Sequence, residues 1–126
     1  MRQTLRWMGT LAALSCPFSK AMASDANGIY TIYGIGGLPC HAFLTAVGRE
    51  REYYEFWLAG FLTASNANYS VTSDITPEGG SQKFFSIVWK QCRAYHDITL
   101  SEAALTIANR LHDRLISNKN PYEGYE

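Results

Sequence analysis

Apolar residues recur at intervals of three and four along most of the chain after residue 38, which is the spacing of one face of an α-helix. The first segment begins at Pro39, which suits a first helical turn, and is interrupted by Gly48 and charged residues 49–52. The two halves stay in phase, so one bent helix and two helices jointed at Gly48 both fit; we predict two. Their predicted apolar face consists of Cys40, Phe43, Leu44, Val47, Tyr54, Trp57, Leu58, Phe61, Leu62 and Ser65.

Two further helices are predicted by the same spacing. The first spans Ser81 to Tyr95, with an apolar face of Phe84, Phe85, Val88, Trp89, Cys92 and Tyr95. The second opens with a capping box, Thr99 to Glu102, and runs to about Ile116 with a buried side of Leu100, Ala104, Ile107, Ala108, Leu111 and Leu115. The pattern therefore predicts an all-α fold, a small bundle of three to four helices over residues 39–117.

Several of these positions are predicted to form the core. A glycine within a helix costs about 1 kcal/mol relative to alanine, and the usual compensation is the close approach of another helix, which we predict at Gly60. Aromatic side chains at helical spacing are more often core than ligand sites. The predicted core residues are Trp57, Gly60, Phe61, Phe85, Trp89 and Leu111.

Three segments lack a helical pattern. Residues 24–38 are rich in glycine and are predicted to be an extended arm, and residues 118–126 a mobile tail. Residues 66–80 contain Pro77, Gly79 and Gly80, which break regular structure, and form the longest predicted loop. Because such loops are often functional, this one is a candidate binding loop, although it could also be a plain connection. The candidate residues are Asn66, Asn68, Tyr69 and Asp74.

The first 23 residues have the pattern of a secretory signal peptide. A basic start is followed by a short apolar run and by Ala21-Met22-Ala23, a small-x-small cleavage site. We predict cleavage after Ala23; a retained N-terminal helix is the alternative. Ala13 stands where a lipobox would favour leucine, so no lipid anchor is expected at Cys16. No later segment is apolar for the roughly 20 residues that span a bilayer, which predicts a periplasmic protein without stable membrane insertion.

Removal of the signal peptide leaves two cysteines, Cys40 and Cys92. An even number of cysteines in an exported protein indicates a disulfide, which here would join two helices; two free buried thiols are the alternative. There is no Cys-x-x-Cys and no histidine pair at ligand spacing. We therefore expect no metal site and no cofactor.

Charge and motifs argue against two classes of function. The signal peptide holds three of the eleven Lys and Arg residues and none of the eleven acids, so the remainder has a net charge of −3, whereas nucleic-acid binding needs clustered basic residues. Neither Gly-x-Ser-x-Gly nor His-Glu-x-x-His occurs. In His96-Asp97 and His112-Asp113, neighbouring helical side chains should point apart, so neither pair is expected to act as a dyad. We predict no catalytic residues, with a small hydrolase as a less favoured alternative.

Three motifs together resemble a known group of proteins. They are Trp57-Leu58-Ala59-Gly60-Phe61-Leu62-Thr63, Trp89-Lys90-Gln91-Cys92-Arg93-Ala94-Tyr95-His96 and Leu100-Ser101-Glu102-Ala103-Ala104, preceded by Cys40 at a helix start. The chain resembles, over about residues 38–115, the small exported proteins grouped around the HdeA-like acid-stress chaperones and the Rap/Tai-type immunity proteins. The resemblance implies a periplasmic helical bundle with a disulfide between Cys40 and Cys92 and no shared catalytic residues. The chain departs from the acid chaperones in its aromatic content and its long central loop.

The expected function is binding of a protein partner of unknown identity, as an accessory or immunity-type protein, with a homodimer left open. The alternative is an acid-stress chaperone. Protonation of the eleven acids below about pH 4 would change the net charge from −3 to about +8, and such a change could loosen the fold and expose aromatic residues.

Overall fold

The computed structural model describes residues 27–69, 72–76 and 78–125, so the predicted signal peptide, its cleavage site and Cys16 lie outside the described residues. The chain divides into residues 1–30 and a compact unit, Thr31–Glu126. The elements of the compact unit are the 3₁₀-helix η1 (Gly34–Gly37) and the α-helices α1 (Cys40–Thr45), α2 (Arg49–Asn68), α3 (Gly80–Ala94) and α4 (Leu100–Ile116). The described residues contain no β-strand, and the predicted all-α fold is confirmed.

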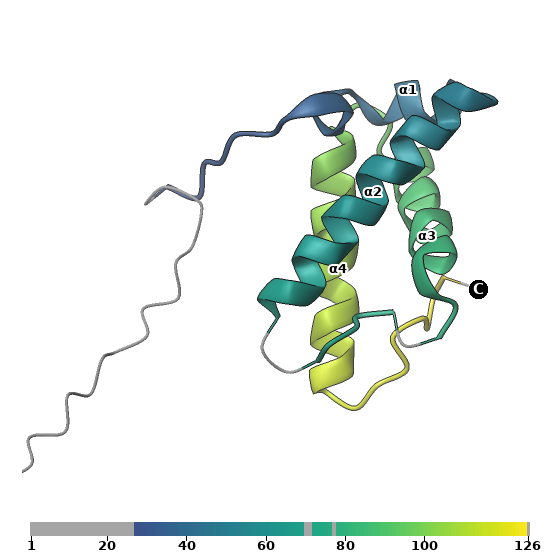
Figure 1. Ribbon diagram of the computed structural model, residues 1–126. Coiled ribbons are helices and arrows are strands. Elements are labelled where there is room, and N and C mark those ends of the chain that lie inside the picture. Colours follow the sequence, from purple (N-terminus) through teal and green to yellow (C-terminus); the bar gives the residue numbers. More distant parts are fainter. Residues whose placement is uncertain (1–26, 70–71, 77, 126) are drawn as a thin grey trace, which may run out of the picture. The chain divides into compact units, whose positions relative to one another are not determined.

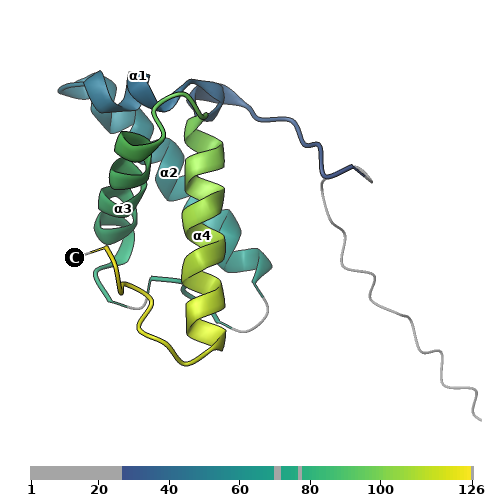
Figure 2. The same cartoon turned by 180° about the vertical axis from the view of Figure 1, so that it is seen from behind.

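The helices are arranged in two layers. α3 and α4 lie side by side, and α2 crosses both of them on one side of the molecule (Figure 1). Seen from behind, α3 and α4 cover α2 (Figure 2). The short helix α1 lies at one end of the bundle and packs mainly on α3, and η1 packs on α2 and α4. One side of α2 thus faces the other helices, and the opposite side faces away from them.

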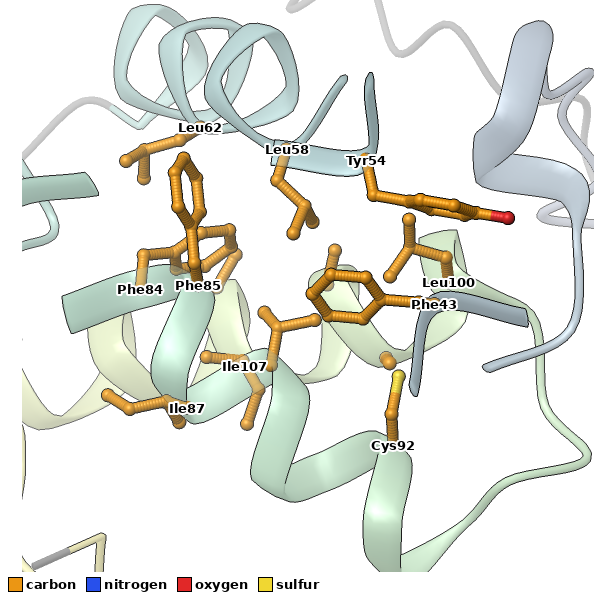
Figure 3. Packing of buried hydrophobic residues seen from close by; sticks show 14 of the residues in the cluster. Phe43, Tyr54, Leu58, Leu62, Phe84, Phe85, Ile87, Cys92, Leu100 and Ile107 are labelled. Atoms are coloured by element: carbon orange, nitrogen blue, oxygen red, sulfur yellow. The ribbon is translucent and has the colours of Figure 1, made fainter. Parts of the chain in front are cut away.

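The core lies between these layers. Tyr54, Leu58 and Leu62 project from the inner side of α2 toward α3 and α4 (Figure 3). The largest side chains that meet them are fully or almost fully buried and come from α1, α3 and α4: Phe43, Phe84, Phe85, Ile87, Leu100, Ile107 and Leu111. Each fully buried side chain of this size stabilises the fold by roughly 1.5–3 kcal/mol through removal from water.

The predicted joint at Gly48 is confirmed. α1 ends at Thr45 and α2 begins at Arg49, and Gly48 between them has a φ of 56°, which glycine adopts at little cost. The helix ends explain two wrong predictions. Val47 lies in the connection and is exposed, and Tyr95 follows the end of α3 and is also exposed. Helical spacing had placed both on buried faces.

The start of α1 is fixed by the turn between α3 and α4. The backbone N–H groups of Cys40 and His41 donate to the carbonyls of Ile98 and His96 at 2.8 and 3.1 Å. The N–H of Leu100 donates to the carbonyl of Leu38 at 2.9 Å. The first N–H groups of a helix have no partner within it, so these bonds satisfy groups that would otherwise be left unpaired.

The predicted disulfide joins the same region to α3. The sulfurs of Cys40 and Cys92 are bonded, and their Cα atoms lie 5.1 Å apart, within the usual range for a disulfide. The bond closes a loop with a sequence separation of 52 residues and holds the start of α1 against α3. Both cysteines are fully buried.

The predicted capping box at the start of α4 is confirmed. The Thr99 hydroxyl accepts from the backbone N–H of Glu102, and the Glu102 carboxylate accepts from the backbone N–H of Thr99 at 2.7 Å. These bonds from Thr99 to the ionised carboxylate lower the pKa of Glu102.

Replacing Glu102 should therefore change stability in a pH-dependent way. A carboxyl with a lowered pKa in the folded state stabilises the protein above its unfolded pKa, about 4.3, and this contribution disappears as the pH falls through the lower folded pKa. We expect Glu102→Ala to unfold at lower denaturant concentration than the parent at pH 7 and at nearly the same concentration at pH 2. Glu102→Gln, which keeps an acceptor oxygen but no titratable group, is the control. If Glu102→Ala lost the same stability at pH 7 and pH 2, the stabilising role of the ionised Glu102 carboxylate would be contradicted.

Close packing of a neighbouring side chain leaves no room for a Cβ at Gly36, whereas no such contact occurs at Gly60 in the described part of the chain. A Cβ on Gly36 would lie 1.9 Å from the ring of Trp57, whereas a Cβ on Gly60 would meet no described atom within 4 Å apart from the nearby backbone of its own helix. Gly36 is buried in η1, and the Trp57 indole N–H donates to the Tyr33 carbonyl at 3.1 Å. The prediction of close helix packing at Gly60 is wrong within this chain, since Gly60 lies on the exposed side of α2.

Alanine at these two positions should have opposite effects. Gly36→Ala should lower the free energy of unfolding by about 1–3 kcal/mol because Trp57 must move. Gly60→Ala should raise it by about 0.5–1 kcal/mol in dilute solution because alanine favours the helix and fits. Denaturant titration followed by tryptophan fluorescence measures both changes. Equal losses in the two variants would contradict this distinction.

The C-terminal tail is held against the helices at more than one residue, since Tyr125 packs against the core and its carbonyl accepts from the Lys90 ammonium. Tyr122 is buried, its hydroxyl donates to the Glu78 carbonyl, and the Lys83 ammonium lies 5.0 Å from the centre of its ring. The same burial raises the pKa of Tyr122. Within the segment predicted to be a mobile tail, Tyr122 therefore packs with the core.

Candidate functional site

The loop predicted to bind a partner is shorter than expected. α2 continues to Asn68, so Asn66 and Asn68 lie in its last turn and not in the loop. The connection to α3 consists of residues 69–79, of which 70–71 and 77 lie outside the described residues. Asparagine has a low helix propensity, and the sequence therefore suggested an earlier helix end.

Side chains of this segment hold it against the bundle. The Asn66 amide donates to Asp74 at 3.3 Å, and its carbonyl oxygen accepts from the Ile75 N–H at 3.0 Å. Asp74 also accepts from the backbone N–H and the hydroxyl of Thr76, both at 2.8 Å. Ile75 is fully buried in the core. Asn66 and Asp74 therefore have a structural role, and deleting the loop would remove a core residue.

Alanine substitutions of Asn66 and Asn68 should accordingly have different effects on the free energy of unfolding. Asn66→Ala removes partners from both Asp74 and the Ile75 N–H, and we expect the free energy of unfolding to fall by about 1–3 kcal/mol. Asn68→Ala is the matched control, because Asn68 is exposed and, within the described residues, its side chain bonds only to the Ala64 carbonyl one turn earlier. It should change stability by less than about 0.5 kcal/mol. Chemical denaturation measures both values, and similar losses for the two would contradict the structural role of Asn66.

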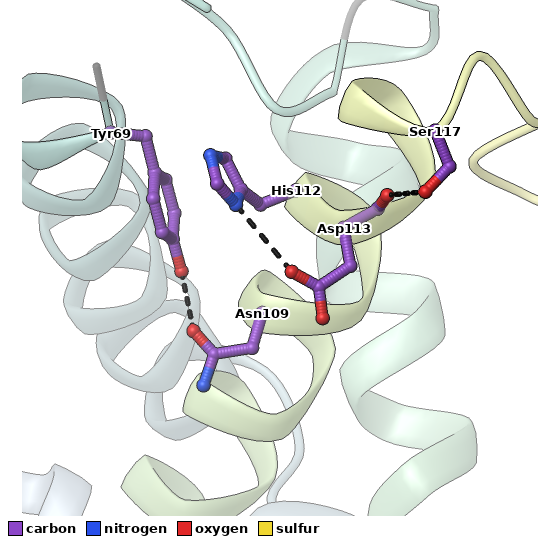
Figure 4. Close-up of polar contacts among 5 residues, drawn as sticks. All are labelled: Tyr69, Asn109, His112, Asp113 and Ser117. Carbon is purple, nitrogen blue, oxygen red and sulfur yellow. Dashed lines mark hydrogen bonds and ion pairs between the residues drawn. The ribbon is translucent and has the colours of Figure 1, made fainter. Parts of the chain in front are cut away.

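Tyr69 joins the end of α2 to α4 (Figure 4). Its hydroxyl donates to the Asn109 side-chain oxygen at 2.7 Å, and its ring stacks on His112 with centroids 4.1 Å apart. Partial burial and the nearby carboxylate of Asp113 raise the pKa of Tyr69. The Tyr69 side chain is thus engaged by α4.

The histidine–aspartate pairs do not form a catalytic set with any described residue. His112 Nδ1 lies 3.7 Å from Asp113, and the Ser117 hydroxyl donates to a backbone carbonyl (Figure 4). His112 Nε2 is buried and has no hydrogen-bond partner in the described part of the chain. His96 Nδ1 lies 2.9 Å from Asp97, closer than predicted, because both residues follow the end of α3 and helical geometry does not apply. That pair is open to solvent.

The predicted core residues fall into three groups. Phe85 and Leu111 are buried as expected. Trp57, Phe61 and Trp89 pack against the core but are only partly buried. The Trp89 indole nitrogen is buried and has no hydrogen-bond partner among the described residues. It lies beside a depression of about 280 Å³ between α2 and α3. Gly60 is the exception, being exposed on the outer side of α2.

No described segment crosses the outer side of α2 (Figure 1), and apolar residues are exposed on that side. Phe56 is 70 % exposed and Tyr53 is 56 % exposed, and both point away from the side that bears Tyr54, Leu58 and Leu62. With the exposed Gly60, Ala64 and Ala67 they follow the helical spacing of three and four. We call this surface the outer face of α2; it consists of Tyr53, Phe56, Gly60, Ala64 and Ala67.

Charged residues are confined to one end of α2. Its five charged residues all lie at or before Glu55, and residues 56–68 contain none. A helix on the surface of a protein normally presents polar and charged residues to water, and α2 instead has apolar residues on opposite sides. This departure makes the outer face of α2 the candidate functional site, whereas sequence periodicity had assigned Gly60 to the core and had not considered Tyr53 or Phe56.

Neither a metal cluster nor a membrane-spanning helix is found in the described part of the chain. Within these residues, no group of three or more His, Cys, Asp or Glu side chains is arranged to hold a metal ion. No helix that they form combines the length and the apolar character needed to cross a bilayer.

Comparison of the chain with protein-family models, with curated proteins and with solved structures finds no match. The resemblance to HdeA-like and Rap/Tai-type proteins therefore stays a prediction.

Proposed function

We propose that the protein is exported, acts without catalysis, and works by binding another protein chain through the outer face of α2. The observation that carries this proposal is the exposure of Phe56 and Tyr53 on a helix whose opposite side already builds the core. Exposed aromatic residues that lie next to one another are typical of protein interfaces, where tyrosine and phenylalanine are enriched and charged residues are depleted at the centre.

The loop between α2 and α3 supports the proposal less well. Its described candidate residues are held by bonds within the chain, since Asn66 and Asp74 bond to each other and Tyr69 bonds to α4. The outer face of α2, by contrast, is rigid because the helix is fixed by its buried side. A rigid apolar surface loses little conformational entropy on binding.

The proposal is tested by chemical crosslinking in the cell followed by purification of the protein. We expect a dominant crosslinked species, with a second copy or with a different protein, that is formed by the parent chain and strongly reduced by Phe56→Ser and Tyr53→Ser. Removing an aromatic residue at the centre of an interface commonly costs more than about 1 kcal/mol of binding free energy.

Tyr95→Ser is the matched control, because Tyr95 is 56 % exposed, as Tyr53 is, but follows the end of α3. It should leave the crosslinked species unchanged. Loss of that species in the Tyr95 variant but not in the Phe56 and Tyr53 variants would refute the proposed site. Repeating the experiment after brief acid treatment examines the chaperone alternative, which predicts many weak partners that form only in acid.

A further inference from the structure

The outer face of α2 has large residues at one end and small residues at the other. Tyr53 and Phe56 lie toward the helix start, Ala64 and Ala67 lie toward its end, and Gly60 lies between them. Phe56 precedes Gly60 by four positions and Ala64 follows it by four. Tyr53 precedes Gly60 by seven positions and Ala67 follows it by seven.

This arrangement is complementary to itself. If two copies of α2 lie antiparallel with their Gly60 residues opposite each other, each Phe56 meets Ala64 of the other copy and each Tyr53 meets its Ala67. Every large side chain then faces a small one, and the glycines allow the helix axes to approach closely. A two-fold interface requires the same patch to fit its own copy, and the spacing on both sides of Gly60 satisfies that requirement.

Charge and helix orientation agree with this pairing. The overlapping segment extends eight residues on each side of Gly60, and its only charged residues, Glu52 and Glu55, are level with the uncharged C-terminal part of the other helix. Glu55 lies off the paired face, since its carboxylate is 3.1 Å from Arg51 beside α3. No like charges are opposed within this segment. The antiparallel orientation also places the positive end of each helix dipole near the negative end of the other.

We propose that the partner of the outer face of α2 is a second copy of this chain, paired antiparallel across Gly60. This inference rests on the proposed function, because it names the occupant of the same face. It also accounts for Gly60, which costs helix stability and has no neighbour within the described part of the chain.

The contact area indicates a weak dimer. The overlap of 17 residues is about 25 Å long and one helix diameter wide, so each helix contributes a contact strip of about 250 Å². Stable interfaces commonly bury about 800 Å² per partner. The dimer should therefore dissociate on dilution, and its formation must be measured over a range of concentrations.

The test is sedimentation equilibrium of the chain, expressed from its full-length sequence under oxidising conditions, at micromolar to millimolar concentrations. We expect a monomer–dimer equilibrium that Phe56→Ala weakens about tenfold or more, as for an aromatic residue at an interface centre. Ala64→Phe should also weaken it, because two phenylalanines would then occupy one position. The double variant Phe56→Ala/Ala64→Phe exchanges the large and small residues and should restore the parent affinity to within about threefold.

Gly60→Leu provides an independent variant: apart from the nearby backbone of α2, no described atom lies within 4 Å of a Cβ at this position, so the monomer should fold normally. Circular dichroism checks that fold. Gly60→Leu should abolish the dimer, while the control Tyr95→Ala should not change it. A parent chain that stays monomeric up to about millimolar concentration, or a dimer that Phe56→Ala and Gly60→Leu leave intact, would overturn the inference. A dimer that the double variant fails to restore would refute the antiparallel pairing across Gly60.

The same variants separate this inference from the proposed function. If the parent chain is monomeric but crosslinks to a different protein in a Phe56-dependent manner, the second-copy inference fails and the binding function stands. If neither self-association nor any crosslink depends on Phe56, both fail.

Discussion

The fold depends on the attachment of α1 to the other helices. α1 has only six residues, too few to be stable as an isolated helix in water. Its first N–H groups are satisfied by carbonyls from the turn between α3 and α4, and its first residue, Cys40, is bonded to Cys92 of α3. Because α2 follows α1 after a short connection, this attachment also fixes where α2 begins and which side of α2 faces the core.

Trp57 provides a second constraint on the orientation of α2. The indole ring packs on Gly36 of η1 with no room for a Cβ, and its N–H bonds to Tyr33. Trp57 thus fastens η1 to one flank of α2, while Tyr54, Leu58 and Leu62 fill the side that faces α3 and α4. The inner side and one flank of α2 are thus committed to contacts within the chain, whereas its outer side carries the exposed Phe56 and Tyr53.

Much of this architecture follows from sequence patterns, and the failures have physical causes. Periodicity located the helices, the joint at Gly48 and the capping box, because these depend on neighbours three or four positions apart. It misplaced Val47 and Tyr95 because periodicity does not show where a helix ends. It assigned Gly60 to the core because the cost of a helical glycine is visible in sequence, but the element that needs a glycine is not. The contact of Gly36 with Trp57 joins residues far apart in sequence, which a local pattern cannot reveal.

The candidate site was missed for a related reason. The apolar residues of α2 suggest one buried stripe when a helix is assumed to have one partner layer, and on that assumption Phe56 is merely an irregular position. In the folded chain, Phe56 is exposed and Leu58 is buried, and both sides of the helix are apolar. Burying one side stabilises the monomer, whereas leaving the other in water forgoes the roughly 25 cal/mol per Å² that burial of apolar surface contributes. Association supplies that burial without any change in fold, which is the physical reason for placing function on the outer face of α2 and not in the bonded loop.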